Sequence, residues 1–149
     1  WQECIEKDSI FFSKFIKDFE LELALPEKFT EQVMKSDVVY LRGGHTQQLF
    51  RLLSLDTDWI SELDGKILAG TSAGAEVIAS YYHVLSTNRT GEGFGLVPIK
   101  VIPHWKSDYF DDTKQDIDWK KALKELKEYK EDLPIYTLVE GQFEVFHDK

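Results

Sequence analysis

The sequence predicts an α/β fold, with a mainly parallel sheet that has helices on both faces. Compact apolar runs typical of buried strands alternate with segments of helical periodicity, and two of these runs end directly in glycine. Strands that alternate with helices of ten or more residues imply right-handed crossovers, which make the strands parallel. Strands are expected at residues 21–25, 38–41, 66–69, 99–102, 135–139 and 143–146, and helices at 3–19, 26–35, 46–55, 75–82 and 112–131.

The first part of the chain is amphipathic. Alternating leucines over 21–25 suit a short strand ended by Pro26, and the helix that follows would bury Phe29, Val33 and Met34. Apolar side chains at spacings of three and four predict the helix before it: Ile5, Phe11, Phe12, Phe15, Ile16 and Phe19.

Two apolar runs in the middle of the chain read as buried strands followed by tight turns. The run 38–41 ends at Gly43-Gly44, and the run 66–69 continues straight into Gly70. A helical pattern follows each turn. The segment 86–95 contains three of the nine glycines and is expected to be a loop.

The last third repeats this alternation. The strand 99–102 leads into Pro103-His104-Trp105, and the final two strands flank Glu140-Gly141-Gln142. Between them, the helix 112–131 would expose a dense Lys/Glu face and bury five residues, namely Ile117, Trp119, Leu123, Leu126 and Tyr129.

Composition predicts one globular domain over residues 1–149, because hydrophobic residues make up 42% and charged residues 30% of the chain. With 18 Lys+Arg against 27 Asp+Glu, the net charge of −9 argues against nucleic-acid and anionic-membrane partners. The single cysteine excludes an internal disulfide and a multi-cysteine zinc site. No apolar run approaches a membrane span of roughly 20 residues, and no signal peptide opens the chain, so we expect a cytoplasmic domain.

The strongest chemical signal is Gly70-Thr71-Ser72-Ala73-Gly74, which lies between an expected strand and an expected helix. Gly-x-Ser-x-Gly in this context is typical of a nucleophile elbow, a strained turn that exposes the serine hydroxyl above the sheet. The backbone N–H of Ala73 would then stabilise an oxyanion at the helix N-terminus. The alternative is a small-residue turn in which Ser72 caps the helix.

Gly44 offers a second oxyanion donor. The turn that contains it also follows a strand, and the carboxyl ends of parallel strands meet at the edge where α/β folds bind ligands. The alternative is an ordinary turn capped by Thr46. His45, next to Gly44, could contact substrate or serve the local structure.

Among four histidines, His104 is the best candidate for a general base because it follows the strand 99–102 at a carboxyl end. His83 is expected to cap a helix C-terminus, and His147 lies in a charged tail. Glu140, at another carboxyl end, is the candidate to orient the imidazole. The alternative acids, which read more simply as solvated capping residues, are Asp108, Asp111 and Asp112.

The order Ser72, His104, Glu140 differs from the order serine, acid, histidine of α/β-hydrolases. An α/β-hydrolase order would require His147 as the base.

Taken together, the motifs resemble those of the serine peptidase family that contains dipeptidase E and cyanophycinase. In chain order they are Gly43-Gly44-x-Thr46, Gly70 to Ala75, Pro103-His104-Trp105 and Glu140-Gly141, and they span residues 37 to about 146. The resemblance implies a flavodoxin-like, class I glutamine amidotransferase-like fold. It also implies that Ser72 is the nucleophile, His104 the base and Glu140 the acid, with Gly44 and Ala73 as oxyanion donors.

Three departures from the family pattern bear on substrate preference. His45 stands where the family usually has Asn, Arg89 follows Asn88 where dipeptidase E has Asp, and the basic glycine-rich segment after the catalytic histidine is missing. We therefore do not carry over a preference for an N-terminal aspartyl residue. His45, Asn88 and Arg89 are the predicted substrate-binding residues, with Lys106 as a further cation that could neutralise an acidic substrate.

The predicted function is a serine hydrolase that cleaves a peptide or isopeptide bond in a small peptide and uses neither a metal nor an organic cofactor. The alternatives are an inactive relative that acts as a binding domain and, less favoured, an esterase that uses His147. The chain starts at Trp1 with a helix, whereas the family domain starts with a strand and further βα elements, so we expect an N-terminally truncated domain. A sheet without that strand has an unpaired edge, which leaves the oligomeric state open, a homodimer included.

Overall fold

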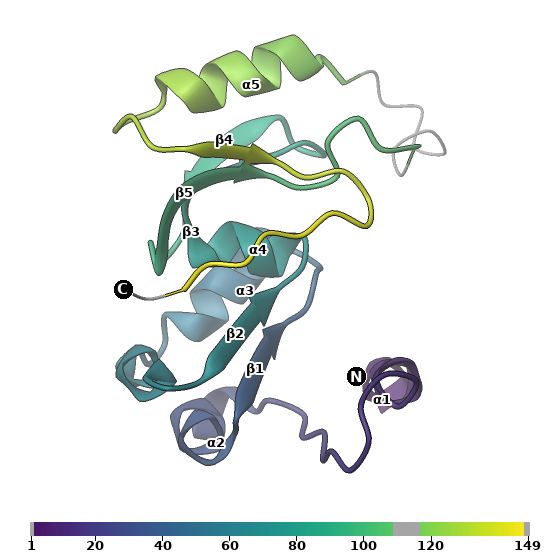
Figure 1. Cartoon of the computed structure of the whole chain (residues 1–149). Helices are drawn as coiled ribbons and strands as arrows, with labels where there is room; N and C mark the ends of the chain where they lie inside the picture. Colours follow the sequence, from purple (N-terminus) through teal and green to yellow (C-terminus); the bar gives the residue numbers. More distant parts are fainter. Residues whose placement is uncertain (1, 109–116, 148–149) are drawn as a thin grey trace.

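A computed structural model describes residues 2–108 and 117–147, and its strands form two sheets (Figure 1). In the first sheet, β1 (Val38–Leu41) pairs in parallel with β2 (Ile67–Gly70). The second sheet has the order β4-β3-β5-β6. Its strands are β3 (Ala79–Val84), β4 (Arg89–Glu92), β5 (Val97–Ile102) and β6 (Ile135–Thr137). Only the β3–β4 pair is antiparallel among these, so the expected α/β fold with mainly parallel pairing is confirmed.

Helices lie on both sides of the strands. Helix α4 (Ala73–Ile78) contacts strands of both sheets and lies between them, and α5 (Trp119–Glu128) covers the outer face of the four-stranded sheet (Figure 1). Helices α2 (Phe29–Lys35) and α3 (Thr46–Leu53) flank the β1–β2 pair. The remaining helical segments are α1 (Gln2–Phe12) and two short 3₁₀ helices, η1 (Pro26–Lys28) and η2 (Asp58–Leu63).

Each sheet has its own apolar core. Trp59 of η2 is fully buried in the first core, where its indole N–H donates a hydrogen bond of 3.1 Å to the Leu53 carbonyl. The second core lies between α5 and the four-stranded sheet, where Ile102 and Leu126 are fully buried. The two cores hold the carboxyl ends of β1, β2 and β5 in fixed positions, and these ends carry the candidate site.

Two predicted strands do not form. Residues 21–25 and 143–146 lie outside the strands of the described chain, and Phe143 has 79% of its surface exposed. Both segments have the alternating pattern of a strand, but a strand needs a neighbouring backbone to satisfy its N–H and C=O groups. The first predicted helix ends at Phe12 rather than residue 19, and its apolar residues Phe11 and Phe15 are exposed.

The predicted helix 75–82 is wrong in its second half. Helix α4 ends at Ile78, and residues 79–84 form β3. The sequence of β3 is rich in tyrosine and ends in valine, residue types that favour strands, and β4 and β5 pair with it on both sides. Four of the ten residues of the expected loop 86–95 form β4, the second strand of a hairpin in which Asn88 has a positive φ of 50°.

The other predicted helices are mostly confirmed. Met34, expected in the core, is 56% exposed, whereas Val33 is buried. The last predicted helix, 112–131, begins in residues that lie outside the described part of the chain, and its described part is α5. No helix within residues 2–108 and 117–147 has the length and apolarity needed to cross a membrane.

Candidate active site

Ser72 lies on the sharp turn between β2 and α4, where it has φ 50° and ψ −116°. Non-glycine residues rarely adopt this conformation, and such strain persists only where the surrounding structure enforces it. Here the Thr71 N–H donates to the Leu41 carbonyl at 3.0 Å, and the Glu76 N–H donates to the Ser72 carbonyl at 3.0 Å. The turn therefore has the strained backbone of a nucleophile elbow.

The two glycines of the elbow are required by close packing. A Cβ on Gly74 would lie 1.9 Å from the Leu41 carbonyl oxygen, and a Cβ on Gly70 would lie 2.6 Å from the carbonyl carbon of Gly74. Both distances are far below van der Waals contact. Glycine at position 74 lets the start of α4 pack directly on the end of β1, and glycine at position 70 lets it pack on the end of β2.

His104 follows β5 and also has a positive φ, of 56°. Two backbone hydrogen bonds continue the β5–β6 pairing past the ends of the strands. The Leu138 N–H donates to the Ile102 carbonyl at 3.0 Å, and the Trp105 N–H donates to the Leu138 carbonyl at 2.9 Å. The segment after β6 is thus held beside His104.

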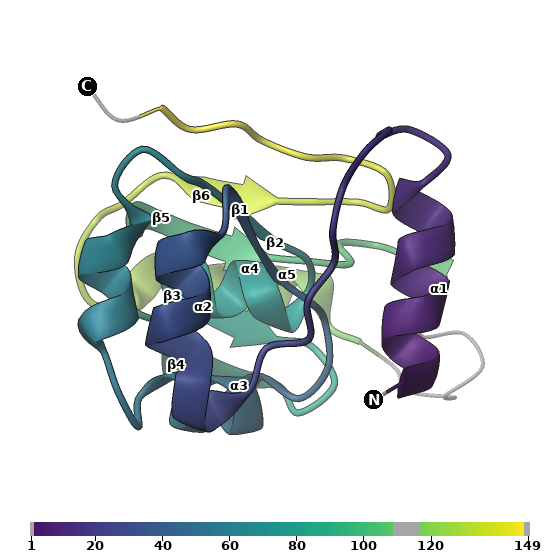
Figure 2. The same ribbon diagram turned by 90° about the horizontal axis from the view of Figure 1, so that it is seen from below.

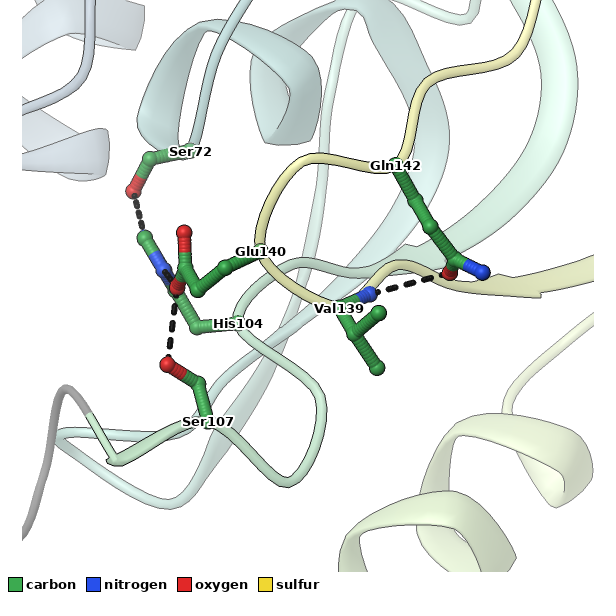
Figure 3. Close-up of polar contacts among 6 residues, drawn as sticks. All are labelled: Ser72, His104, Ser107, Val139, Glu140 and Gln142. Carbon is green, nitrogen blue, oxygen red and sulfur yellow. Dashed lines mark hydrogen bonds and ion pairs between the residues drawn. The ribbon is translucent and has the colours of Figure 1, made fainter.

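Glu140 lies on a tight turn in that segment. The Gln142 N–H donates to the Val139 carbonyl at 3.0 Å, and the Val139 N–H donates to the Gln142 side-chain oxygen at 3.2 Å (Figure 3). Gly141 supplies the left-handed conformation of the turn, with φ 82°. The turn directs the Glu140 carboxylate toward His104.

The structure brings Ser72, His104 and Glu140 together in one hydrogen-bonded array (Figure 3). The Ser72 Oγ lies 3.0 Å from His104 Nε2, and His104 Nδ1 lies 2.5 Å from Glu140 Oε1. With the imidazole proton on Nδ1, the ring donates to the carboxylate and accepts from the serine hydroxyl. This arrangement can activate a hydroxyl as a nucleophile by general-base catalysis.

Ser107 is a partner of this array that the sequence reasoning missed. Its hydroxyl is buried and donates to Glu140 Oε1 at 2.8 Å, so the same carboxylate oxygen accepts from both His104 and Ser107 (Figure 3). The hydrogen bond from His104, and then that from Ser107, hold the pKa of the Glu140 carboxyl below its usual value. In the sequence, the only signal for Ser107 is that it lies three residues after His104.

The two predicted oxyanion donors lie on adjacent turns. A Cβ on Gly43 would lie 3.0 Å from the Ser72 Cβ, so the turn after β1 approaches the elbow closely. Ala73 begins α4 and is buried, whereas a Cβ on Gly44 would meet nothing within 4 Å. There is thus open space beside Gly44, on the turn whose preceding residue, Gly43, approaches the serine.

The family model of peptidase family S51 matches residues 14–149. The chain belongs to peptidase family S51. This is the dipeptidase E family whose motifs the sequence resembles, so that prediction is confirmed.

Among solved structures, the S51 chain is similar to the crystal structure of a peptidase from an acI-B1 Actinobacterium, with a TM-score of 0.55 and 26% sequence identity. The match covers 76% of this chain and 47% of that one, so this chain spans about half the length of its structural relative. No curated protein sequence matches it significantly.

The predicted substrate-binding residues of this S51 chain have different surroundings. His45 caps α3, because its Nδ1 accepts a hydrogen bond of 3.3 Å from the Gln48 N–H. Asn88 and Arg89 are exposed in the β3–β4 hairpin, at the carboxyl end of β3, and β3 is the parallel neighbour of the strand that leads to His104. Contact of these three residues with substrate stays a prediction.

The other candidate bases and acids have simpler surroundings. His83 caps no helix: it lies in β3, fully buried, with its Nδ1 3.2 Å from the Thr90 hydroxyl, and burial lowers its pKa. His147 and Asp108 are exposed. Asp111 and Asp112 lie outside the described residues.

Glu76 is a second residue near the candidate site that was not predicted from the sequence. It lies on the first turn of α4, only 5% exposed, and accepts a short hydrogen bond from the Thr46 hydroxyl. Burial raises the pKa of Glu76 to about 7, although the hydrogen bond from Thr46 and the nearby His104 act in the opposite direction. Its signal was present in the sequence, since Glu76 is the one charged residue among the small and apolar residues 73–79.

Proposed function

We propose that this chain is a serine peptidase that hydrolyses a peptide or isopeptide bond in a small peptide, with Ser72, His104 and Glu140 as its catalytic triad. The observation that carries the proposal is the hydrogen-bonded array itself, with 3.0 Å between Ser72 Oγ and His104 Nε2 and 2.5 Å between His104 Nδ1 and Glu140 Oε1. Membership of peptidase family S51 supports the same reaction class.

In the proposed reaction, Ser72 Oγ attacks the carbonyl carbon of the scissile bond while its proton passes to His104 Nε2. Glu140 accepts the hydrogen bond from Nδ1 and stabilises the imidazolium that forms. The backbone N–H groups of Ala73 and Gly44 stabilise the oxyanion of the tetrahedral intermediate, an effect whose loss typically costs about 10²–10³ in rate per donor. His104 then protonates the leaving amine, and water hydrolyses the acyl-enzyme by the same steps in reverse.

The electrostatics of Glu140 support its role in this reaction. Its lowered pKa keeps the carboxylate ionised through the neutral range, as is needed to stabilise a charged imidazolium. The proposed substrate contacts of His45 and Arg89 are supported by the positions of these two residues. His45 lies next to the open space beside Gly44, and Arg89 supplies an exposed cation in the β3–β4 hairpin.

Labelling with a fluorophosphonate probe, which reacts with activated serine hydroxyls, tests the catalytic assignment. We expect the wild-type chain to be labelled and Ser72→Ala and His104→Ala to lose labelling, because the first lacks the nucleophile and the second lacks its base. His147→Ala is the matched control and should be labelled like the wild type. Full labelling of Ser72→Ala would falsify the assignment, and loss in His147→Ala alone would favour the esterase alternative.

Substrate class is tested with a panel of X-Ala and Asp-X dipeptides that includes β-aspartyl peptides. We expect release of free amino acids from at least one class and no release by Ser72→Ala. A wild-type chain that is labelled by the probe but cleaves no peptide would contradict peptidase activity. A folded wild type that is neither labelled nor active would favour the alternative of a binding domain.

A further inference from the structure

A buried pair of side chains joins the two helices that begin at the candidate oxyanion turns. Thr46 and Glu76 are 6% and 5% exposed, and the Thr46 hydroxyl donates to the Glu76 carboxylate. A buried carboxylate without a donor costs free energy, so this hydrogen bond satisfies a group that water does not reach.

The position of the pair in the chain connects it with the site. Thr46 is the first residue of α3, two residues after Gly44, and Glu76 is on the first turn of α4, three residues after Ala73. The hydrogen bond therefore ties together the starts of the two helices whose preceding turns carry the proposed oxyanion donors.

A second connection joins the same two turns on their other side. Thr71 Oγ1 accepts from the Gly43 N–H at 3.3 Å and lies 3.1 Å from the Tyr40 hydroxyl. This connection is exposed, so water competes for its hydrogen bonds, and the Gly43–Thr71 distance of 3.3 Å is long for a hydrogen bond. The buried Thr46–Glu76 pair is thus the stronger side-chain link between the turns.

We infer that Thr46 and Glu76 are positioning residues that hold the backbone N–H groups of Gly44 and Ala73 at the separation needed to bind one oxyanion. The inference rests on the proposed function. An oxyanion hole must be held in place before the reaction, and a misplacement of about 1 Å can cost on the order of 10²-fold in rate. Neither side chain touches substrate in this role.

The groups around Glu76 come from three elements. The Thr46 hydroxyl of α3 and the His104 imidazole after β5 act on its carboxyl, and the Tyr82 phenol of β3 is a neighbour whose pKa is raised by burial and then by the charge of Glu76. Because burial raises the pKa of Glu76 to about 7, the group that accepts from the Thr46 hydroxyl changes from a neutral carboxyl to a carboxylate near that pH. This gives the Thr46–Glu76 pair, here called the brace, a pH dependence that an apolar contact would lack.

Thr46→Val tests the brace because it keeps the shape of the side chain and removes the donor. We expect the rate constant for phosphonylation of Ser72 by the fluorophosphonate probe to fall by about tenfold or more, with the half-saturating probe concentration changed by less than about twofold. Thr46→Ser restores the hydroxyl and should restore most of the rate. A merely structural role would lower the fraction of folded protein without changing the rate constant of the molecules that remain folded.

Glu76→Gln provides a second test should Thr46→Val fail to fold. The amide oxygen can still accept from Thr46, so we expect a rate within about threefold of the wild type near pH 6. The amide cannot ionise, so the dependence of the rate constant on pH between about 6 and 8 should differ from that of the wild type. An unchanged pH profile would contradict a brace whose acceptor ionises in this range.

The outcomes separate the two proposals. A wild-type chain that is not labelled overturns the proposed function and the brace together. A labelled wild type, with a folded Thr46→Val variant that reacts at the wild-type rate or with a Glu76→Gln profile identical to that of the wild type, overturns the brace alone.

Discussion

Two residues of the candidate site have backbone conformations that non-glycine residues rarely adopt. Ser72 and His104 both have positive φ angles, of 50° and 56°, and the turn that carries Glu140 needs a left-handed glycine at position 141. Conformations of this kind cost of order 1–3 kcal/mol each and persist only where neighbouring structure enforces them. The strain therefore shows that the surrounding hydrogen bonds and close glycine contacts fix the array before any substrate binds.

At Glu140, the predicted consequence of losing one hydrogen bond is a slower reaction. Ser107→Ala removes one of two donors to Oε1, so we expect the carboxyl pKa to rise and the rate constant for phosphonylation to fall by about twofold to tenfold. The loss should be larger at low pH, where the higher pKa leaves less of the carboxylate ionised. Rate constants measured from about pH 3.5 to 7, a range that extends below the ordinary carboxyl pKa of 4.5, check this.

Ser61→Ala is the control for this variant, because the Ser61 hydroxyl donates to the Asp58 carbonyl in η2, in another part of the chain. Its rate constants should equal those of the wild type at every pH. A Ser107→Ala profile parallel to that of the wild type, with no greater loss at low pH, would contradict the role given to the second donor.

The sequence indicated the residues of the array because each follows a strand. Ser72, His104 and Glu140 lie after β2, β5 and β6, and a parallel fold collects such positions at one edge. Ser107 and Glu76 could not be singled out in this way. Glu76 does stand out as the one charged residue among residues 73–79, but its role depends on its burial, and that burial depends on how α3 packs against α4.

At the scale of elements, a buried lysine holds the end of α5. Lys100 of β5 is fully buried, and its ammonium donates to the carbonyls of Leu126, Lys127 and Tyr129 at 2.9, 3.0 and 2.7 Å. These carbonyls lie at the C-terminal end of α5 and its C-cap, where the helix carries partial negative charge, and the Leu126 carbonyl also accepts from the Tyr129 N–H at 3.3 Å. Lys100 thus fastens α5 to the four-stranded sheet.

Lys100→Met should lower the free energy of unfolding by about 2–3 kcal/mol, because three carbonyls lose their hydrogen bond from the buried ammonium. Urea unfolding followed by circular dichroism measures the change. Lys124→Met is the control on the same helix, since Lys124 is exposed and forms only a long ion pair with Glu128, and its effect should stay within about 0.5 kcal/mol. Equal stability of the two variants would contradict the capping role.

Elements whose partners are local in sequence were predicted well, and those that depend on distant partners were not. The strand–turn–helix units at 38–53 and 67–78 carry their own signals, an apolar run followed by glycines. The alternating segments 21–25 and 143–146 have the same pattern as a strand but no pairing in the described structure. Residues 79–84 are the opposite case. Local periodicity predicted that a helix would extend into them, but they form a strand because β4 and β5 pair with them on both sides.

At the scale of the whole molecule, the parallel strands are divided between two sheets with α4 between them (Figure 1). The site forms across this division, since Ser72 follows a strand of the first sheet while His104 and Glu140 follow strands of the second. Helix α1 stands apart from both sheets (Figure 2). It contacts the end of β1 through the Asp8–Arg42 ion pair and the packing of Phe12 on Tyr40.

Because α4 and its Glu76 lie between the sheets, the ionisation of one carboxyl affects the stability of the whole fold. The pKa of Glu76 is raised from 4.5 to about 7 by burial, so the folded chain binds a proton that the unfolded chain has already released between these values. The stability contributed by the neutral carboxyl is complete below about pH 4.5 and is lost as the pH rises through about 7, a change of order 3 kcal/mol. Urea unfolding at several pH values should therefore show wild-type stability falling from about pH 5 to 8 relative to Glu76→Gln, which cannot ionise.

Glu144→Gln makes the same change at an exposed position and should keep the wild-type dependence of stability on pH. Equal slopes for Glu76→Gln and Glu144→Gln would show that Glu76 is already ionised in the folded chain at low pH, and that burial does not hold its proton.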